Sequence, residues 1–171
     1  MTTPAARLTL ALYQPDIAQN VGAMLRTCAC LGVEAAIIEP ACIVLSDRRL
    51  RRAGMDYLDA ATIARHLSFE RFEAWRAEVG RRLVALTTTG ETTLWDFAFR
   101  PGDVVLVGRE SAGLPAEVKA RADARVRIPI EAPLRSLNVG VAAALALGEA
   151  RRQLRGRADL IDAGERDKTA P

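Results

Sequence analysis

The sequence predicts an α/β fold, in which a parallel sheet carries helices on both faces. Short apolar runs that suit buried strands alternate along the chain with longer segments of helical periodicity. Strands of a parallel sheet are covered on both faces, which explains why these runs are apolar throughout rather than alternating. The 171 residues are 50% hydrophobic, enough for one domain with a substantial core.

The first strand is expected at Leu8–Tyr13, where the sequence LTLALY is almost wholly apolar. A helix should follow over Asn20–Leu31 and end at Gly32, because its apolar residues recur at helical spacing. That stripe consists of Val21, Met24, Leu25, Cys28 and Leu31. Ala35–Ile38 then predicts a second strand, closed by a proline.

The middle of the chain repeats the alternation. Ser68–Val79 has the periodicity of an amphipathic helix, and Leu83–Leu86 predicts the third strand. Glu91–Pro101 is expected to be a connection that leads to a fourth strand at Val104–Val107. A short helix is expected over Ala116–Arg121, directly after a proline.

The last strand and helix are predicted near the C-terminal end. Val126, Ile128 and Ile130 alternate with other residues in a strand-like pattern. Val139–Leu147 is apolar almost all round, which predicts a buried helix. Gly140 and Gly148 suggest a close approach of the helix backbone to another helix or to a ligand. We expect residues 1–155 to form the domain and residues 156–171, which are polar and small, to form a flexible tail.

Two small polar residues, Ser136 and Asn138, directly precede this apolar helix. Asn138 is a favourable N-cap residue, so both side chains could serve only to begin the helix. They could equally be the few polar groups in an otherwise apolar wall, which is how many cofactor sites are built. The residues alone leave both interpretations open.

Composition excludes several classes of protein. No apolar run is long enough to span a membrane, and the N-terminal segment lacks the features of a signal peptide, so we expect a cytoplasmic protein. Cys28, Cys30 and Cys42 have neither disulfide-framework nor zinc-site spacing, and there is a single histidine. We therefore expect no metal site, and we expect the cysteines to pack as small residues.

A cluster of four arginines lies within five residues, at Arg48, Arg49, Arg51 and Arg52. The cluster could be a solvated face balanced by the nearby aspartates. It could also bind phosphates, because several fixed cations neutralise a nucleic-acid backbone. The net charge of +3 is compatible with a nucleic-acid partner without requiring one.

The common nucleotide-binding, metalloprotease and hydrolase motifs are absent from the chain. Three polar loops instead follow predicted strands, at Thr87–Gly90, Gly108–Pro115 and Glu131–Asn138. Ligands of open α/β sheets bind at the carboxyl ends of the strands. The loops therefore predict a site for a polar or anionic ligand, without naming its chemistry.

Three longer motifs resemble those of a known family. PDIAQNVGxxxR (residues 15–26), VGRESAGLP (107–115) and RIPI…RSLNV (127–139) resemble the three motifs of the SPOUT RNA 2′-O-methyltransferases. Within that superfamily the chain is similar to the TrmL type, the tRNA (cytidine/uridine 2′-O)-methyltransferases that act at the wobble position of the anticodon. The segments IIEP, DRRLRRAGMDY and ALTTTG support this similarity.

The resemblance implies a homodimer with a C-terminal trefoil knot, a fold feature that periodicity would not suggest. S-adenosylmethionine would lie in the knot, contacted by Leu86, Gly108, Ile128 and Ser136. The resemblance also makes Asn20, Glu110 and Asn138 motif residues that order the loops. It makes Arg26 the residue that acts on the ribose 2′-hydroxyl, reaching the site from the partner subunit. The arginine cluster would hold the tRNA backbone.

Two other functions stay open at this stage. The chain could methylate a different position of tRNA or a ribosomal RNA, or it could be a non-catalytic RNA-binding dimer that has kept the fold. The motif residues Asn20, Arg26, Glu110, Ser136 and Asn138 are all present, which favours an enzyme.

Overall fold

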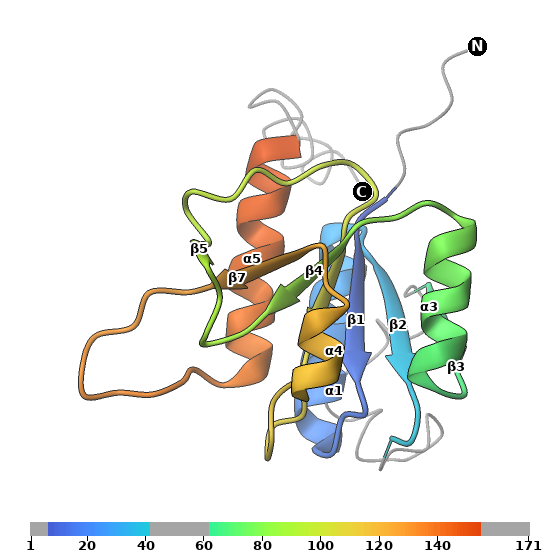
Figure 1. Ribbon diagram of the computed structural model, residues 1–171, viewed down its shortest axis with the longest axis horizontal. Coiled ribbons are helices and arrows are strands. Elements are labelled where there is room, and N and C mark those ends of the chain that lie inside the picture. Colours follow the sequence, from blue (N-terminus) through green and yellow to red (C-terminus); the bar gives the residue numbers. More distant parts are fainter. Residues whose placement is uncertain (1–6, 42–61, 155–171) are drawn as a thin grey trace, which may run out of the picture.

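A computed structural model describes residues 7–41 and 62–154 of the chain (Figure 1). Seven strands form one sheet with the order β3-β2-β1-β6-β4-β7-β5, and every pair of neighbours is parallel. The strands are β1 (Thr9–Tyr13), β2 (Glu34–Ile38), β3 (Ile63–His66), β4 (Leu83–Leu86), β5 (Thr92–Thr93), β6 (Val104–Val107) and β7 (Ala124–Arg127). The predicted parallel α/β sheet is therefore confirmed.

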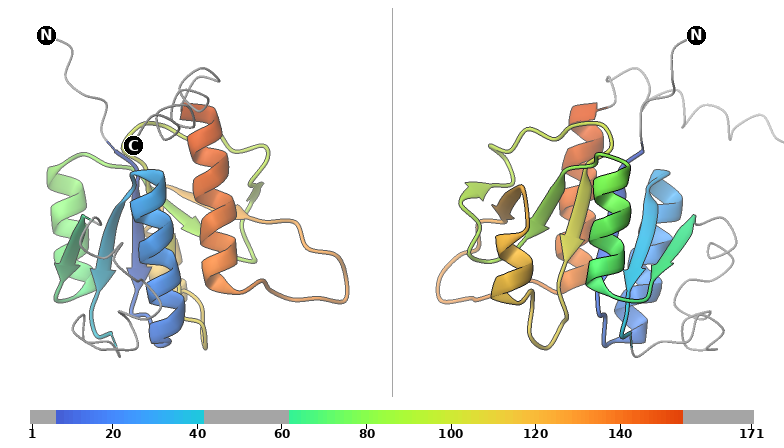
Figure 2. Two further views of the ribbon diagram at one scale, coloured as in Figure 1. Left: turned by 180° about the vertical axis from the view of Figure 1, so that it is seen from behind. Right: turned by 45° about the vertical axis from the view of Figure 1, so that its right-hand side comes forward.

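Helices cover both faces of the sheet, as predicted (Figures 1 and 2). The described helices are α1 (Ala18–Leu31), α3 (Phe69–Glu78), α4 (Ala116–Ala120) and α5 (Val139–Leu154). Successive strand residues point to opposite faces, so Leu10 and Leu12 of β1 pack toward α1 and α5 while Ala11 and Tyr13 pack toward α3 and α4. Each face thus has its own buried core.

The ends of the first two described helices follow from their sequences. Gly32 ends α1 in the left-handed conformation (φ 62°), where its N–H bonds to the last carbonyls of the helix. Ser68 begins α3 by accepting a hydrogen bond from the Arg71 N–H at 3.3 Å. The predicted stripe of α1 is buried from Val21 to Cys28.

Two short strands were not predicted. β3 and β5 lie at the two edges of the sheet, and each pairs with a single neighbour. Edge strands are covered on fewer sides, so they need no apolar run. The sequences IARH and TT carry no such run, which explains why periodicity missed both strands.

The strand predicted from the Val126, Ile128 and Ile130 alternation is wrong in its second half. β7 ends at Arg127, the residue that pairs with Thr93 at the end of β5. Pro129 has no N–H to donate to a ladder, so the strand does not continue through it. Residues 128–138 instead leave the sheet as a long loop that returns to the start of α5 (Figure 1).

Helix α5 is less buried than predicted. It buries one stripe, Ala143, Ala146, Leu147 and Ala150, against α1 and the sheet. Val141 and Leu145 are 50% and 39% exposed, because this chain covers only one side of the helix. Within the described part of the chain no other segment comes close to Gly148, where an added Cβ would meet no atom within 4 Å.

Several predictions can be placed only in part. Cys28 is buried as expected, whereas Cys30 is exposed and does not pack in the core. Cys42, the arginine cluster Arg48, Arg49, Arg51 and Arg52, and the proposed tail at 156–171 lie outside the described residues. The knot stays a prediction from the resemblance. None of the helices described here is long and apolar enough to cross a bilayer.

Candidate active site

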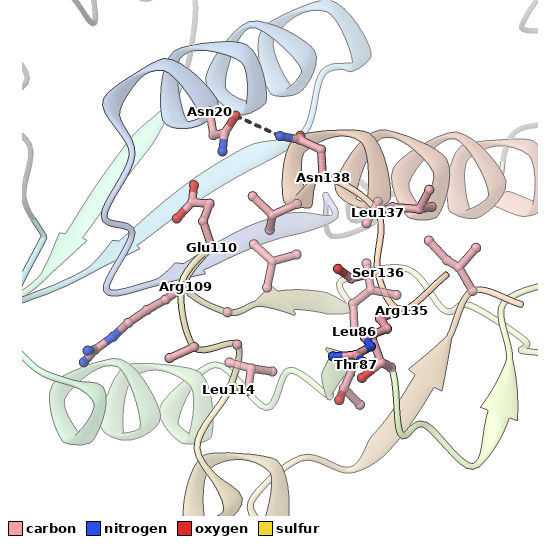
Figure 3. Close-up of a pocket in the computed structure, with 18 of the residues that line it drawn as sticks. Asn20, Leu86, Thr87, Arg109, Glu110, Leu114, Arg135, Ser136, Leu137 and Asn138 are labelled. Atoms are coloured by element: carbon pink, nitrogen blue, oxygen red, sulfur yellow. Dashed lines mark hydrogen bonds between the residues drawn. The ribbon is translucent and has the colours of Figure 1, made fainter. Parts of the chain in front are cut away.

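A pocket of about 600 Å³ opens where the carboxyl ends of β4, β6 and β7 meet the N-terminal ends of α1 and α5 (Figure 3). Its size is typical of sites for small ligands. The walls come from Leu86–Thr88, Val107–Leu114 and the 128–142 segment, with two residues next to or in α1. They consist of Ile17, Asn20, Leu86, Thr87, Thr88, Val107, Gly108, Arg109, Glu110, Ala112, Gly113, Leu114, Ile128, Ile130, Arg135, Ser136, Leu137, Asn138, Val139 and Ala142.

The pocket gathers most of the residues that the sequence singled out. All four predicted cofactor contacts line it: Leu86, Gly108, Ile128 and Ser136. Three of the four predicted catalytic residues line it as well: Asn20, Glu110 and Asn138. Arg26 is not among the lining residues and lies exposed on α1. The three predicted polar loops thus converge on one pocket, while Arg26 stands apart from it.

Asn138 caps α5, as one of its two interpretations has it, and it also lines the pocket and bridges to α1. Its Oδ1 accepts hydrogen bonds from the N–H groups of Gly140 at 2.9 Å and Val141 at 3.3 Å. Its Nδ2 donates to Oδ1 of Asn20 at 3.2 Å (Figure 3). One side chain therefore fixes the start of α5 and joins it to the first turn of α1.

Gly108 permits a close crossing of the chain beneath the pocket. A Cβ at this position would lie 2.3 Å from the carbonyl carbon of Gly113 and 2.5 Å from the nitrogen of Leu114. Such contacts are too short for any side chain, so only glycine lets the loop fold back on itself. Gly90 plays the same part under β7, where a Cβ would lie 2.4 Å from the carbonyl carbon of Val126.

Glu110 is held by a second carboxylate, Asp16, which precedes α1. The Asp16 N–H donates to Oε2 of Glu110 at 3.3 Å, and the Glu110 N–H donates to Oδ1 of Asp16 at 3.2 Å. The Ser111 hydroxyl donates to Oδ2 of Asp16. Oε1 of Glu110 is buried without a hydrogen-bond partner in the described part of the chain, and the carboxyl group points toward Asn20 (Figure 3).

These contacts shift the two carboxyl groups in opposite directions. Hydrogen bonds from the Glu110 and Ser111 side chains lower the pKa of Asp16 to about 2. Burial raises the pKa of Glu110, and the neighbouring Asp16 carboxyl raises it further. A proton added to the pair therefore goes to Glu110.

Several lining residues were not singled out from the sequence as individual contacts. Thr87 and Thr88 belong to the hydroxyl-rich turn that was predicted as a whole, and Arg135 adds a cation beside Ser136 (Figure 3). The position of Arg135 next to a predicted contact was the available signal. Asp16 lies in the first quoted motif, but nothing in the sequence indicated its contact with Glu110, which lies 94 residues further along the chain. No set of metal-ligating side chains was found in residues 7–41 and 62–154.

Comparison with known proteins identifies a family of similar sequences. A model of the SpoU rRNA Methylase family matches residues 7–148 of the chain. A tRNA (cytidine(34)-2′-O)-methyltransferase of Beijerinckia indica subsp. indica is 63% identical over 154 residues, which make up 90% of this chain and 96% of that protein.

Solved structures agree with the sequence match. A chain from structural work on the 2-OH methylation of C/U34 on tRNA is 44% identical with a TM-score of 0.85, and the similarity covers 89% of this chain and 99% of that one. The SpoU methyltransferase AviRb from Streptomyces viridochromogenes, in complex with AdoMet, is 27% identical with a TM-score of 0.82 over 91% of this chain and 61% of its own.

Proposed function

This chain belongs to the SpoU rRNA Methylase family, and we propose on that premise that it methylates the ribose 2′-hydroxyl of the wobble nucleotide of tRNA. The observation that carries the proposal is the near-full-length similarity to a tRNA (cytidine(34)-2′-O)-methyltransferase. The methyl donor is S-adenosylmethionine, as the AdoMet complex of a structural neighbour supports. Because tRNA works in translation, which takes place in the cytoplasm, we place the enzyme there.

The pocket suits this donor in size and chemistry. Leu86 and Ile128 offer apolar surface for an adenine ring, while Ser136 and the backbone around Gly108 offer polar contacts. We assign these four residues to cofactor binding. When bound, S-adenosylmethionine supplies an activated methyl group on a sulfonium centre, so the protein has only to align the reactants and help remove one proton.

Asn20 and Asn138 join α1 to the start of α5, and Glu110 joins the loop after β6 to the segment before α1. Such fixed geometry favours in-line attack by the ribose oxygen, because catalysis of this kind depends on alignment. Glu110 carries the carboxyl group with the raised pKa, and it lines the pocket directly. We therefore assign these residues to the catalytic arrangement.

Arg26 serves a different part of the reaction. A guanidinium is not deprotonated in proteins, so Arg26 does not act as a general base. We propose that it binds a phosphate beside the target nucleotide and stabilises the developing alkoxide. Arg26 does not line the pocket of its own subunit. This supports the proposal that it acts on the pocket of a partner subunit.

The partner is a second copy of this chain. Val141 and Leu145 lie one helical turn apart on α5 and are exposed, and Leu137, 39% exposed, precedes them. Ile17, next to α1, is 46% exposed. Exposed apolar side chains of this size at neighbouring helix ends suit a self-complementary interface. We propose that a homodimer covers them and brings Arg26 of each subunit toward the pocket of the other.

The tRNA backbone is assigned to the arginine cluster Arg48, Arg49, Arg51 and Arg52. Replacing these arginines should weaken tRNA binding and flatten its dependence on salt concentration. An unchanged salt slope would favour the alternative of a solvated face. We also propose that residues 1–155 form the catalytic domain, with the knot that the resemblance implies, and that residues 156–171 form a tail.

Nucleoside mass spectrometry tests the function most directly. The protein is incubated with S-adenosylmethionine and tRNA from a strain that lacks its gene, and the digested tRNA is searched for 2′-O-methylated cytidine or uridine. A new methylated nucleoside that maps to the wobble position is expected. A nucleoside that maps elsewhere in tRNA or ribosomal RNA would assign a different substrate, and cofactor binding without any transfer would indicate a non-catalytic RNA-binding protein.

A further inference from the structure

Asp16 and Glu110 meet at the point where the order of the strands reverses. The chain runs outward from β1 to β2 and β3, whereas β6 pairs with β1 on its other side. Leu12 pairs with Val107, so the segments that follow β1 and β6 leave the same edge of the sheet together. Ligands of open α/β sheets bind at such switch points. Asp16 therefore lies at the edge of the sheet from which the pocket-lining loop after β6 leaves.

The contact between the two segments is reciprocal. Each of Asp16 and Glu110 donates its backbone N–H to the carboxylate of the other, and Ser111 adds a hydroxyl donor to Asp16. The arrangement resembles a capping box, in which two side chains satisfy each other's backbone groups. It ties the loop after β6 to the segment before α1 at the residue that lines the pocket.

Among the described residues, Asp16 is the carboxylate that contacts Glu110. Helix α1 contributes the neutral amide of Asn20, and α5 contributes Asn138 behind it. Arg109, on the same loop, extends away from Glu110, with its guanidinium 5.8 Å from the centre of the Tyr13 ring, and Arg135 lies across the pocket (Figure 3). Loss of the Asp16 charge would thus remove a like-charge neighbour from Glu110.

We propose that Asp16 is a positioning residue for methyl transfer, which fixes the loop at 108–113 and places a second carboxylate beside the Glu110 carboxyl group. This proposal rests on the proposed function for its catalytic meaning. Asp16 itself contacts neither substrate nor donor in this role. It acts through Glu110, whose carboxyl group faces the pocket.

Two variants separate the contributions of anchoring and charge. Asp16→Asn keeps an oxygen that can accept from the Glu110 N–H but removes the negative charge. We expect its acidic limb in the pH profile of kcat to move to lower pH by about half a unit or more, because the pKa of Glu110 falls when the like charge is removed. Asp16→Ala loses the anchor too, and we expect kcat to fall about tenfold or more with a smaller change in KM.

Asp96→Asn is the matched control. Asp96 also accepts a hydrogen bond from a hydroxyl group, that of Thr93, but it is exposed and does not line the pocket. Its pH profile and kcat should equal those of the unmodified protein. Binding of S-adenosylhomocysteine and the thermal midpoint of Asp16→Asn should also stay unchanged, which would exclude a general folding defect.

A second readout does not depend on activity. The carboxyl carbon of Glu110, labelled with ¹³C and assigned with Glu110→Gln, should titrate at lower pH in Asp16→Asn than in the unmodified protein. Identical titrations, or coincident pH profiles together with a kcat of Asp16→Ala within about threefold, would overturn the proposal. An unmodified protein that transfers no methyl group to RNA would overturn the proposed function instead, and the titration would still decide the role of Asp16.

Discussion

Asn138 donates a hydrogen bond to Asn20 at 3.2 Å and so joins the start of α5 to the first turn of α1 across 118 residues of sequence. The same Asn138 side chain caps α5 through its oxygen. One amide group thus makes both a local contact, the helix cap, and a long-range contact, the bridge to α1. Substitutions at this position can separate them.

Asn138→Ser should lose the bridge and keep the cap, because serine is a favourable N-cap residue but too short to reach Asn20. Asn138→Ala should lose both and cost about 1 kcal/mol more in the free energy of unfolding than Asn138→Ser. Urea denaturation measures the difference. Both variants should lose methyl transfer, and full activity of Asn138→Ser would show that the bridge is dispensable.

Gly108→Ala should destabilise the protein and abolish binding of S-adenosylhomocysteine, since the added Cβ would lie 2.3 Å from the backbone of Gly113. Gly148→Ala is the matched control, because that position is exposed in α5 and an added Cβ meets nothing. Gly148→Ala should bind S-adenosylhomocysteine normally whatever its effect on the proposed dimer, because Gly148 lies on the exposed α5 face with Val141 and Leu145, away from Gly108. Thermal unfolding and calorimetric titration measure the two effects, and equal behaviour of the two variants would contradict the close crossing.

Cys30 should react with iodoacetamide at pH 8, whereas Cys28 should react only after unfolding. Cys28 is buried on the core side of α1, and burial raises the pKa of its thiol to about 12. The thiolate is the reactive form, so the native thiol of Cys28 is protected twice, by access and by ionisation. Peptide mass spectrometry before and after denaturation identifies the labelled residue. Rapid native labelling of Cys28 would contradict the packing of α1.

Val141→Glu should convert the proposed dimer into a monomer, because the charge would be buried in the interface. Leu67→Glu is the control, since Leu67 is 82% exposed and lies before α3, away from α5. Light scattering coupled to size-exclusion chromatography gives the mass of each variant. A monomeric unmodified protein, or a dimer that tolerates Val141→Glu, would rule out this face as the interface.

Arg26→Ala should bind S-adenosylhomocysteine normally and transfer no methyl group. A second variant, Ser136→Trp, should block the pocket. If Arg26 acts across the interface, mixing the two inactive variants should restore up to about a quarter of the activity, because half of the random dimers are hybrids and each has one competent site. No recovery in verified hybrids would place Arg26 in its own subunit's site, and a fully active Arg26→Ala would remove it from the reaction.

The local elements of the fold could be predicted from the sequence because their signals are local. The apolar runs at Leu83–Leu86 and Val104–Val107 coincide with β4 and β6, and the stripe of α1 lies where the periodicity placed it. β3 and β5 carried no signal, because an edge strand is only partly covered. α5 looked buried all round because periodicity does not distinguish apolar residues that face the core from those, such as Val141 and Leu145, that lie exposed on the other side of the helix.

The candidate site divides in the same way. Motif resemblance pointed to Gly108, Ser136 and Asn138, since each belongs to a continuous segment with a recognisable pattern. The sequence by itself thus determined the order of the elements, the family and the three loops. Tertiary structure alone decided that Asp16 holds Glu110 and that Asn138 reaches Asn20, because these contacts join residues 94 and 118 positions apart. Such pairs come together only when the parallel strands place their ends at one edge of the sheet. No local sequence pattern indicates which distant residues will then meet.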